Sequence, residues 1–305
     1  MRTLFEARDR LFRTTDRGFL IVECVKCRFL RLFPRPAPHE LARYYPENYY
    51  FTPDADAVSQ IAELYRRAVL ADHVRFIRRA VEKIEGPLLD VGCSGGLLDR
   101  LLRDGGTKAL GLDNAEHPAR LAWTINAVPV MCADLLAAPL RDGSFAAVTM
   151  FHLLEHVPDP RAYLAAAKRL LKPDGRLIVQ VPNAASWQFL IFGENWNGID
   201  VPRHLWNFRA SDLEWLLQEC GFEVVRRKFF SLRDNPAGMA SSIAPGLDPM
   251  ARRVRGIRES GAWGFAKNLA YLGLTLACLP FAALEALCRA GSTVMVEARV
   301  RPTAS

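Results

Sequence analysis

The middle of the chain alternates short apolar runs with segments of helical periodicity. The runs, which are typical of buried strands, cover 88–92, 109–112, 128–132, 146–151 and 176–181. Between them, apolar residues recur every three or four positions, as on one face of a helix. This alternation predicts a mostly parallel sheet that is covered by helices on both faces. The expected fold class is therefore α/β, with a doubly wound sheet.

The flanking segments have different patterns. The first 50 residues contain a predicted strand at Gly18–Val22, followed by a proline-rich and then a tyrosine-rich connection. The periodicity at 57–84 predicts a helix, and an apolar run at 292–300 predicts a final strand. We expect three parts: an N-terminal accessory segment at 1–50, a core domain at 51–235 and 292–305, and an apolar helical insert at 236–291.

The insert begins with a loop-like stretch at 236–262 and continues into an apolar run at 269–288. This run is close to the shortest length that spans a membrane, but Pro280 and Glu285 argue against a simple span. A hairpin that dips into one leaflet or a pair of dimerisation helices fits better, and an ordinary buried helix pair is the alternative. Because basic residues precede the run, as in interfacial anchors, we expect 264–290 to contact a membrane surface.

Composition narrows the partners and the compartment. The chain has 305 residues, a net charge of +7 and 50% hydrophobic residues, so it can bury a large core. Its positive charge is concentrated at 1–35 and 226–259, which suits an anionic membrane or substrate, and no recognisable DNA-binding module accompanies it. The seven cysteines are scattered, and the N-terminus lacks an apolar signal segment. We expect no nucleic-acid partner and a cytoplasmic location, with the inner face of the membrane as the alternative.

Three aspartates stand at the ends of three successive predicted strands. Asp90 precedes the loop Gly92-Cys-Ser-Gly-Gly96, whose spacing does not fit the dinucleotide pattern G-x-G-x-x-G and disfavours a nicotinamide oxidoreductase. A carboxylate at this place suits a cationic amino-acid tail and a sulfonium better than a pyrophosphate. Asp113 can accept both hydroxyls of a ribose, and Asp134 can read an adenine amino group. The alternative is that Asp113 and Asp134 only cap the segments that follow them.

A series of stretches, in this order, resembles the core of the class I S-adenosylmethionine-dependent methyltransferases. They are Asp90–Gly96, Gly111–Asp113, Asp134, Asp142–Phe145, Leu154–Pro160 and Leu171–Val181. They are similar to the branch that includes quinone-biosynthesis O-methyltransferases and many sugar and natural-product methyltransferases. Two departures from the family pattern, Ser94 in the loop and Ala146 after Phe145, leave the expected cofactor contacts in place.

The resemblance implies a Rossmann-like fold with an antiparallel final strand, and S-adenosyl-L-methionine as the cofactor. It implies that the cofactor is bound by Asp90, Gly92, Cys93, Ser94, Gly96, Asp113, Asp134 and Phe151. The expected reaction is methyl transfer to a small-molecule, glycan-precursor or lipid-linked acceptor. A nucleic-acid substrate is disfavoured because no Asn/Asp-Pro-Pro-Tyr segment follows the fourth strand. The alternative function is a non-catalytic protein that binds S-adenosylmethionine or a membrane and keeps the fold.

Three histidines are candidates for a catalytic base, which is needed where the nucleophile must lose a proton. His152 follows the fourth strand, and His156 lies one turn later beside Glu155. The alternative for both is a cap or loop anchor. Related quinone methyltransferases suggest that Glu155 and His156 help to hold a divalent ion, but two ligands are too few, and we predict no metal.

The third histidine, His204, lies in an aromatic stretch at 187–208 that we expect to cover the substrate. In similar methyltransferases a Pro-Arg-His segment followed by an aromatic residue closes the active site. The preceding Arg203 could pair with a carboxylate or phosphate of the substrate. The alternative is a surface loop whose tryptophans pack on the sheet.

The accessory segment contains the pattern Cys24-x-x-Cys27, which is half of a zinc-ribbon spacing. Structural zinc sites need four ligands. In the similar methyltransferases a second cysteine pair lies upstream, and this sequence has no such pair. The segment is therefore interpreted as a degenerate zinc ribbon, and zinc binding by the two cysteines stays open.

Overall fold

The computed structural model describes residues 1–50, 57–257, 259 and 261–302. The chain divides into two compact units. The core unit comprises 50–181, 213–231 and the residues from 295 onwards, and the accessory unit comprises 1–49, 182–212 and 232–294. Each unit thus combines segments from several places in the sequence. The three parts expected from the sequence were divided mainly in sequence order, and that division stays a prediction. Its boundary at residue 51 lies outside the described residues.

Within the described residues, seven strands form one sheet in the order β10-β11-β8-β7-β4-β5-β6. Their bounds are β4 Leu88–Val91, β5 Ala109–Asp113, β6 Val130–Cys132, β7 Phe145–Phe151, β8 Leu171–Pro182, β10 Phe222–Lys228 and β11 Thr293–Val300. The neighbours from β8 to β6 pair in parallel, and β11 runs antiparallel to β10. The predicted Rossmann-like sheet with an antiparallel final strand is confirmed.

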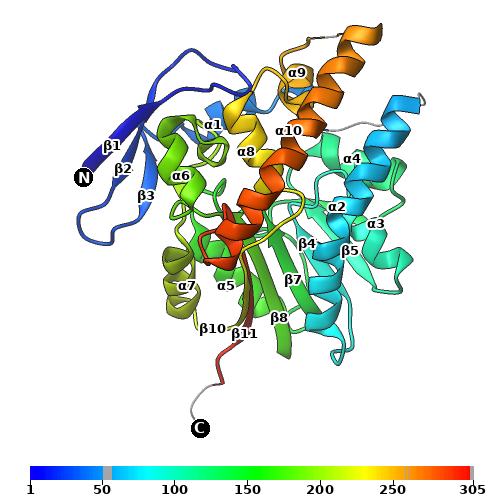
Figure 1. The fold of residues 1–305 in the computed structure, drawn as a ribbon. Helices are drawn as coiled ribbons and strands as arrows, with labels where there is room; N and C mark the ends of the chain where they lie inside the picture. Colours follow the sequence, from blue (N-terminus) through cyan, green and yellow to red (C-terminus); the bar gives the residue numbers. More distant parts are fainter. Residues whose placement is uncertain (51–56, 258, 260, 303–305) are drawn as a thin grey trace. The chain divides into compact units, whose positions relative to one another are not determined.

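Helices cover both faces of this sheet (Figure 1). They are α2 Ala57–Val81, α3 Leu97–Asp104, α4 Glu116–Thr124, α5 Pro160–Leu170 and α7 Ala210–Glu219. Apolar side chains of α2 and α3, such as Ile77 and Leu102, are fully buried against Leu88, Ala147 and Ile178 of the strands. This apolar burial is the main favourable term that holds helices on a sheet.

Local hydrogen bonds and turns fix the ends of the elements in the core. Asp159, whose place before Pro160 is typical of a helix N-cap, accepts hydrogen bonds from the first N–H groups of α5. Ser211 and Glu214 have the spacing of a capping box, but α7 begins at Ala210 and it is Asp212 that accepts the Arg209 N–H. The segment 172–175, whose sequence Lys-Pro-Asp-Gly is typical of a turn, is part of β8 and interrupts its pairing with β7, because the register shifts between Leu171 and Arg176.

The accessory unit contains a second sheet, which is antiparallel and has the order β1-β2-β3-β9. Its strands are β1 Arg2–Ala7, β2 Phe19–Glu23, β3 Leu30–Phe33 and β9 Trp206–Asn207. Short helical segments accompany it: α1 Pro38–Leu41, η1 Ala42–Tyr44, η2 Glu47–Tyr49, α6 Trp187–Phe192, η3 Gly193–Asn195 and η4 Asn197–Ile199. Phe19, Ile21 and Leu30 of this sheet are buried against Trp196 and Leu205. The predicted strand at Gly18–Val22 thus corresponds to β2.

The insert differs from its prediction in two ways. The stretch 236–262, predicted as a loop, contains most of α8 Asn235–Ile243, all of α9 Pro249–Val254 and the start of the next helix. The apolar run lies in a single continuous helix, α10 Gly261–Leu287, and not in a hairpin or helix pair. Contacts with α8 and a hydrogen bond beyond Pro280, from Gln188 to Glu285, hold both halves of α10 in one element.

Candidate active site

The loop between β4 and α3 brings backbone groups to the carboxyl ends of the parallel strands. Gly92, Ser94 and Gly96 have positive φ angles of 78°, 50° and 72°. A Cβ atom at Gly96 would lie 2.8 Å from the Ala122 side chain, so this position has no room for one. A Cβ atom at Gly95 would meet nothing within 4 Å, so the loop is open on that side. A cofactor can therefore approach the backbone closely, as the sequence predicts.

Asp113, the last residue of β5, is held against this loop. One of its carboxylate oxygens accepts the Ser94 N–H at 2.9 Å, and the other accepts the Ala115 N–H at 3.0 Å. Burial raises the pKa of the Asp113 carboxyl, although these backbone donors oppose the shift. These hydrogen bonds fix the carboxylate at the end of β5, and they do not use all of its acceptor sites, so it can still accept a hydrogen bond from a ribose hydroxyl.

Asp90 lies in β4, one strand away from Asp113. The Thr149 hydroxyl of neighbouring β7 donates a hydrogen bond to it at 2.5 Å. Burial raises the pKa of Asp90 to about 7, against the effect of hydrogen bonds from Thr149 and Asp99. Asp99, a fully buried residue of α3, was not among the predicted site residues. Its sequence position in an amphipathic helix contains no signal for this contact.

Two further predicted residues lie at neighbouring strand ends. Asp134 follows β6 and accepts hydrogen bonds from the Tyr163 hydroxyl at 3.2 Å and from the Leu136 N–H at 2.8 Å. It therefore does cap the segment that follows, which was the alternative interpretation, and Tyr163 is an additional partner. Phe151 ends β7 and meets the His73 ring of α2 edge-on at 5.4 Å.

Two residues near this site, Gly111 and Tyr50, are not predicted from the sequence. A Cβ atom at Gly111 would lie 2.7 Å from the sulfur of Cys93, so this position has no room for one. The pKa of Tyr50 is raised to about 12 by its burial and by the charge of Asp113. Its ring also lies 5.8 Å from that of His117 on α4. The connection that contains Tyr50 has no periodicity from which this position could be predicted.

Both ring nitrogens of His152, the first candidate base, have partners. Its Nε2 lies 2.8 Å from the Gln180 side-chain nitrogen, and its Nδ1 lies 3.3 Å from a Glu155 oxygen. The Gln180 amide thus donates to Nε2, and Nδ1 donates to Glu155. A proton from an acceptor can reach Nε2 only when the Gln180 hydrogen bond is broken. The backbone of His152 has a φ of 51°, which is rare for a residue other than glycine.

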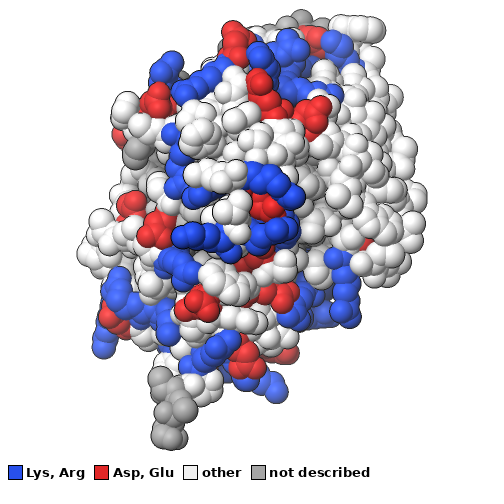
Figure 2. Space-filling model, turned by 90° about the vertical axis from the view of Figure 1, so that its left-hand side faces the viewer, with Lys and Arg blue, Asp and Glu red and all other residues white. Residues whose placement is uncertain are grey.

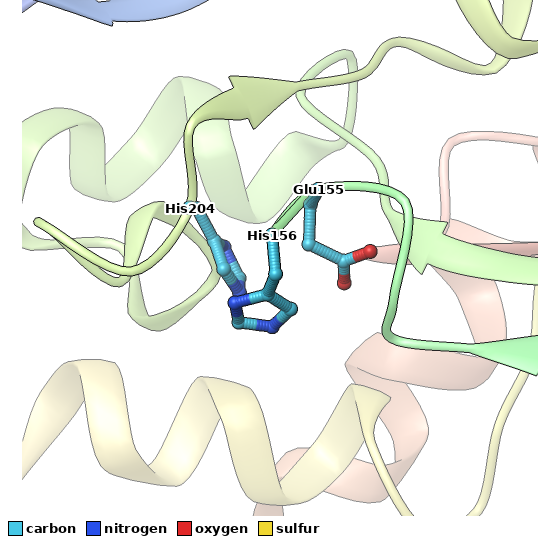
Figure 3. A group of neighbouring side chains, drawn as sticks. All are labelled: Glu155, His156 and His204. Atoms are coloured by element: carbon cyan, nitrogen blue, oxygen red, sulfur yellow. The ribbon is translucent and has the colours of Figure 1, made fainter. Parts of the chain in front are cut away.

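Glu155 and His156 are consecutive residues of the loop after β7, and both side chains extend to the same side of the loop (Figure 3). A carboxylate oxygen of Glu155 and a ring nitrogen of His156 lie within 4.8 Å of each other. Glu155 is buried and is also the partner of His152. The core unit therefore supplies one imidazole and one carboxylate here. These are the two ligands considered above, and two ligands are too few to predict a metal site.

Arg203 and His204 belong to the accessory unit. The guanidinium of Arg203 is fully buried and donates to Asp9 at 2.9 Å and to Asp200 at 2.7 Å. The predicted pairing of Arg203 with a substrate anion is therefore wrong, because its hydrogen-bonding capacity is used inside the fold. His204 Nδ1 lies 2.9 Å from the Gly198 carbonyl and so donates to it, and Nε2 lies 3.9 Å from a carboxylate oxygen of Asp200.

Cys24 and Cys27 lie in the connection between β2 and β3. Hydrogen bonds from the backbone of Cys27 and Lys26 lower the pKa of Cys24 to about 7, so this thiol is readily ionised. In the part of the chain that the structure describes, no third cysteine, histidine or acidic residue joins them in a metal-binding group. The accessory unit thus retains two sulfur ligands without the other half of a zinc site.

The chain is similar to several known methyltransferases. Residues 62–227 match a family model described as a methyltransferase domain. A ubiquinone biosynthesis O-methyltransferase from Pseudomonas aeruginosa is 31% identical over 173 residues, which cover 53% of this chain and 74% of the relative. The enzyme of the same name from Marinobacter nauticus is 33% identical over 174 residues, covering 52% and 72%. The crystal structure of a methyltransferase from Galdieria sulphuraria has a similar fold, with a TM-score of 0.51, 19% identity and coverage of 83% and 91%.

Proposed function

This chain belongs to the class I S-adenosylmethionine-dependent methyltransferases, and on that premise we propose that it methylates a small, lipid-linked acceptor at the cytoplasmic face of a membrane. The cofactor supplies an electrophilic methyl group on a sulfonium. Asp113 is the proposed ligand of the ribose hydroxyls, and Asp134 of the adenine. Asp90, Gly92, Cys93, Ser94, Gly96 and Phe151 complete the proposed cofactor site.

The observation that carries the membrane part of this proposal is the inverted polarity of α10. Its exposed residues are uncharged, and the large ones are Trp263, Phe265, Leu269, Leu272, Leu276, Leu284 and Leu287. Its polar residues point inward: Tyr271 shares a hydrogen bond with Ser241 at 2.9 Å, and Gln188 donates to Glu285 at 2.9 Å. A helix in water has the opposite arrangement, with its apolar face in the core. The outer face of α10 therefore suits an apolar environment.

The inner contacts favour a helix that lies in the membrane plane. By length and composition, α10 could cross a membrane. Crossing would separate Glu285 from Gln188 and leave the buried donors and acceptors of this pair without each other, at a cost of about 1–3 kcal/mol for each unsatisfied group. A helix in the interface keeps each inner contact and still buries its leucines, each of which contributes about 1.5–3 kcal/mol.

The charge of the accessory unit also suits an anionic lipid surface. The unit holds 19 Lys and Arg residues against 13 Asp and Glu residues, so it carries six of the chain's seven excess positive charges. On the face drawn in Figure 2, charged side chains gather in one area, where Lys and Arg cover more of the surface, and a broad area beside them carries almost none. Positive charge next to an apolar face is the pattern of interfacial anchors.

His152, His156 and His204 are the proposed candidates for the base that receives the acceptor's proton. An in-line displacement needs chiefly an aligned nucleophile, and a base only where the nucleophile is protonated. Replacement of the true base by alanine should lower kcat and leave cofactor affinity unchanged. If none of the three replacements lowers kcat, the proposal of a histidine base is wrong. If no acceptor is methylated at all, the chain is a non-catalytic member of the family.

Flotation with vesicles of phosphatidylethanolamine and phosphatidylglycerol tests the membrane contact. The wild-type protein should float with the vesicles, and part of the binding should persist at high salt because the contact is apolar. The double variant Leu269→Glu/Leu276→Glu should stay in solution, whereas Trp123→Glu, an equally exposed apolar site on α4, should float. Affinity for S-adenosylhomocysteine should be the same in all three proteins.

Either of two results would refute the membrane proposal. In one, the wild-type protein does not bind vesicles. In the other, the Leu269→Glu/Leu276→Glu variant floats as well as the wild type. A dimer in solution that the same two substitutions dissociate, without vesicle binding, would assign the face to a second copy of the chain instead.

A further inference from the structure

Asp99, in the first turn of α3, has an unusual environment for a carboxyl group. It is fully buried, and its neighbour is the carboxyl group of Asp90 in β4. Among the described residues, neither Asp99 oxygen has a hydrogen-bond partner when the group is taken as a carboxylate. A buried carboxylate that accepts no hydrogen bond is strongly destabilised. Asp99 is therefore expected to be protonated in the folded protein.

The groups around Asp90 and Asp99 favour the protonated form of Asp99 and the ionised form of Asp90. Thr149 of β7 donates to Asp90, which favours the ionised form of that residue. Asp99 has the N–H of its own backbone and the charge of Arg103, from its own helix, to oppose its burial, and the charge of Asp90 adds to the effect of burial. Cys93 and Asp113 are the other titratable neighbours, and the negative charge of Asp113 opposes ionisation of Asp90. With a proton on Asp99, its hydroxyl can donate to Asp90, and the pair carries one negative charge instead of two.

We propose that Asp99 is a positioning residue which, as a neutral acid, donates a hydrogen bond to Asp90 and keeps Asp90 ionised, so that the site discriminates between cationic S-adenosylmethionine and neutral S-adenosylhomocysteine. This inference rests on the proposed cofactor site. Methyl transfer removes the positive charge of the sulfonium. A single, stabilised negative charge on Asp90 favours the cofactor over its product, and this difference helps the product to leave.

Isothermal titration calorimetry with both ligands, from about pH 6 to about pH 9, tests the role of Asp99 through Asp99→Asn and Asp99→Leu. An asparagine amide also donates a hydrogen bond and carries no charge, so Asp99→Asn should keep the affinities of the wild type. Leucine has a similar volume but no donor, so the ionisation of Asp90 should shift to higher pH. Because the pKa of Asp90 is already about 7, its affinity for S-adenosylmethionine at pH 7 should fall by about fivefold for the first unit of that shift and by about tenfold for each further unit.

The ratio of the two affinities separates this role from a merely structural one. In Asp99→Leu, binding of S-adenosylhomocysteine should fall less than binding of S-adenosylmethionine, and alkaline pH should restore the latter. The inference is wrong if Asp99→Asn binds S-adenosylmethionine as poorly as Asp99→Leu, or if Asp99→Leu keeps the wild-type ratio at each pH. Thermal unfolding checks that the variants fold. Failure of the cofactor site itself is distinguishable, because the wild-type protein would then bind neither ligand.

Discussion

Arg203 lies at the centre of a polar network inside the accessory unit. Its guanidinium is 0% exposed and reaches Asp9, Asp200 and the carbonyl of Tyr44. Burial by itself would lower the pKa of Arg203, but the charges of Asp200 and Asp9 raise it. Two carboxylates and one guanidinium that are buried together depend on one another for their solvation. The network therefore joins β1, where the chain begins, to the segment before β9.

Removal of this guanidinium should destabilise the protein strongly. Arg203→Met should lower the free energy of unfolding by about 3–5 kcal/mol, because the buried Asp9 and the partly buried Asp200 lose the guanidinium that pairs with both of them. Arg2→Met removes an exposed arginine that pairs with Glu23 and should cost at most about 1 kcal/mol. Urea denaturation followed by circular dichroism measures both. Equal stabilities of the two variants would contradict the structural role of Arg203.

Asp113 allows a sharper test of the cofactor site. Asp113→Asn replaces one carboxylate oxygen by an amide nitrogen, which cannot accept the N–H groups of Ser94 or Ala115. The loss of a charged hydrogen bond, worth about 1.5–3 kcal/mol, should weaken binding of S-adenosylmethionine roughly 10- to 100-fold in calorimetry. Asp104→Asn, at the exposed end of α3, is the matched control and should bind normally. Unchanged affinity in Asp113→Asn would remove this residue from the site.

At the scale of elements, α10 is held by its polar residues and exposes its apolar ones. Glu285 is buried, and it accepts hydrogen bonds from the backbone and side chain of Gln188. Burial raises the pKa of Glu285. This contact lies near the end of α10, beyond Pro280, where the helix would otherwise be free to diverge from the unit. Polar contacts therefore add to the apolar packing of α10 through buried residues such as Cys278 and Ala282.

Adjacent substitutions can test this inversion. Glu285→Ala removes the acceptor of the Gln188 backbone N–H and of one of its two side-chain hydrogen bonds, and should cost about 1–3 kcal/mol of stability. Leu284→Ala, one residue away and 51% exposed, should change the stability in aqueous buffer by less than about 0.5 kcal/mol. Hydrogen exchange of the amides in α10, together with urea denaturation, measures the difference. A larger effect of Leu284→Ala would mean that the outer face of α10 is packed against protein.

At the scale of the whole molecule, buried acids make the stability depend on pH. Burial raises the pKa values of Asp90, Asp99 and Asp113 above those of an unfolded chain. The unfolded state releases these protons near about pH 4, whereas the folded state releases them only at higher pH, so stability falls as the pH rises through this interval. Asp72 has the opposite dependence, but its pKa is lowered to about 2, and its contribution is lost only in more acidic solution.

The expected outcome is a melting temperature that decreases between about pH 4 and about pH 7 through the contribution of these acids. Asp99→Asn cannot hold the extra proton, so its melting temperature should decrease less over this range. Differential scanning calorimetry of the two proteins, at constant ionic strength, gives the comparison. Identical pH profiles would show that Asp99 is ionised in the folded state, and this would also refute the proposed role of the residue.

The core sheet and the acidic residues at its edge can be predicted from local patterns in the sequence. Strands and helices of the core are local patterns with periods near two and 3.6 residues, so the runs that end near Asp90, Asp113 and Asp134 can be recognised without tertiary information. Parallel strands bring their carboxyl ends to one edge. The order of these three aspartates therefore predicts the cofactor site, and the N-cap at Asp159 follows from equally local chemistry.

The pairs of side chains that are buried against one another could be identified only from the three-dimensional structure. Arg203 is paired with Asp9, which is far away in the sequence, and Asp99 meets Asp90 only because α3 packs on the sheet. The continuity of α10 and its inward polar face depend on contacts such as Gln188 with Glu285. A linear pattern records the polarity of each residue, but the protonation and pairing of a buried group depend on its neighbours in space.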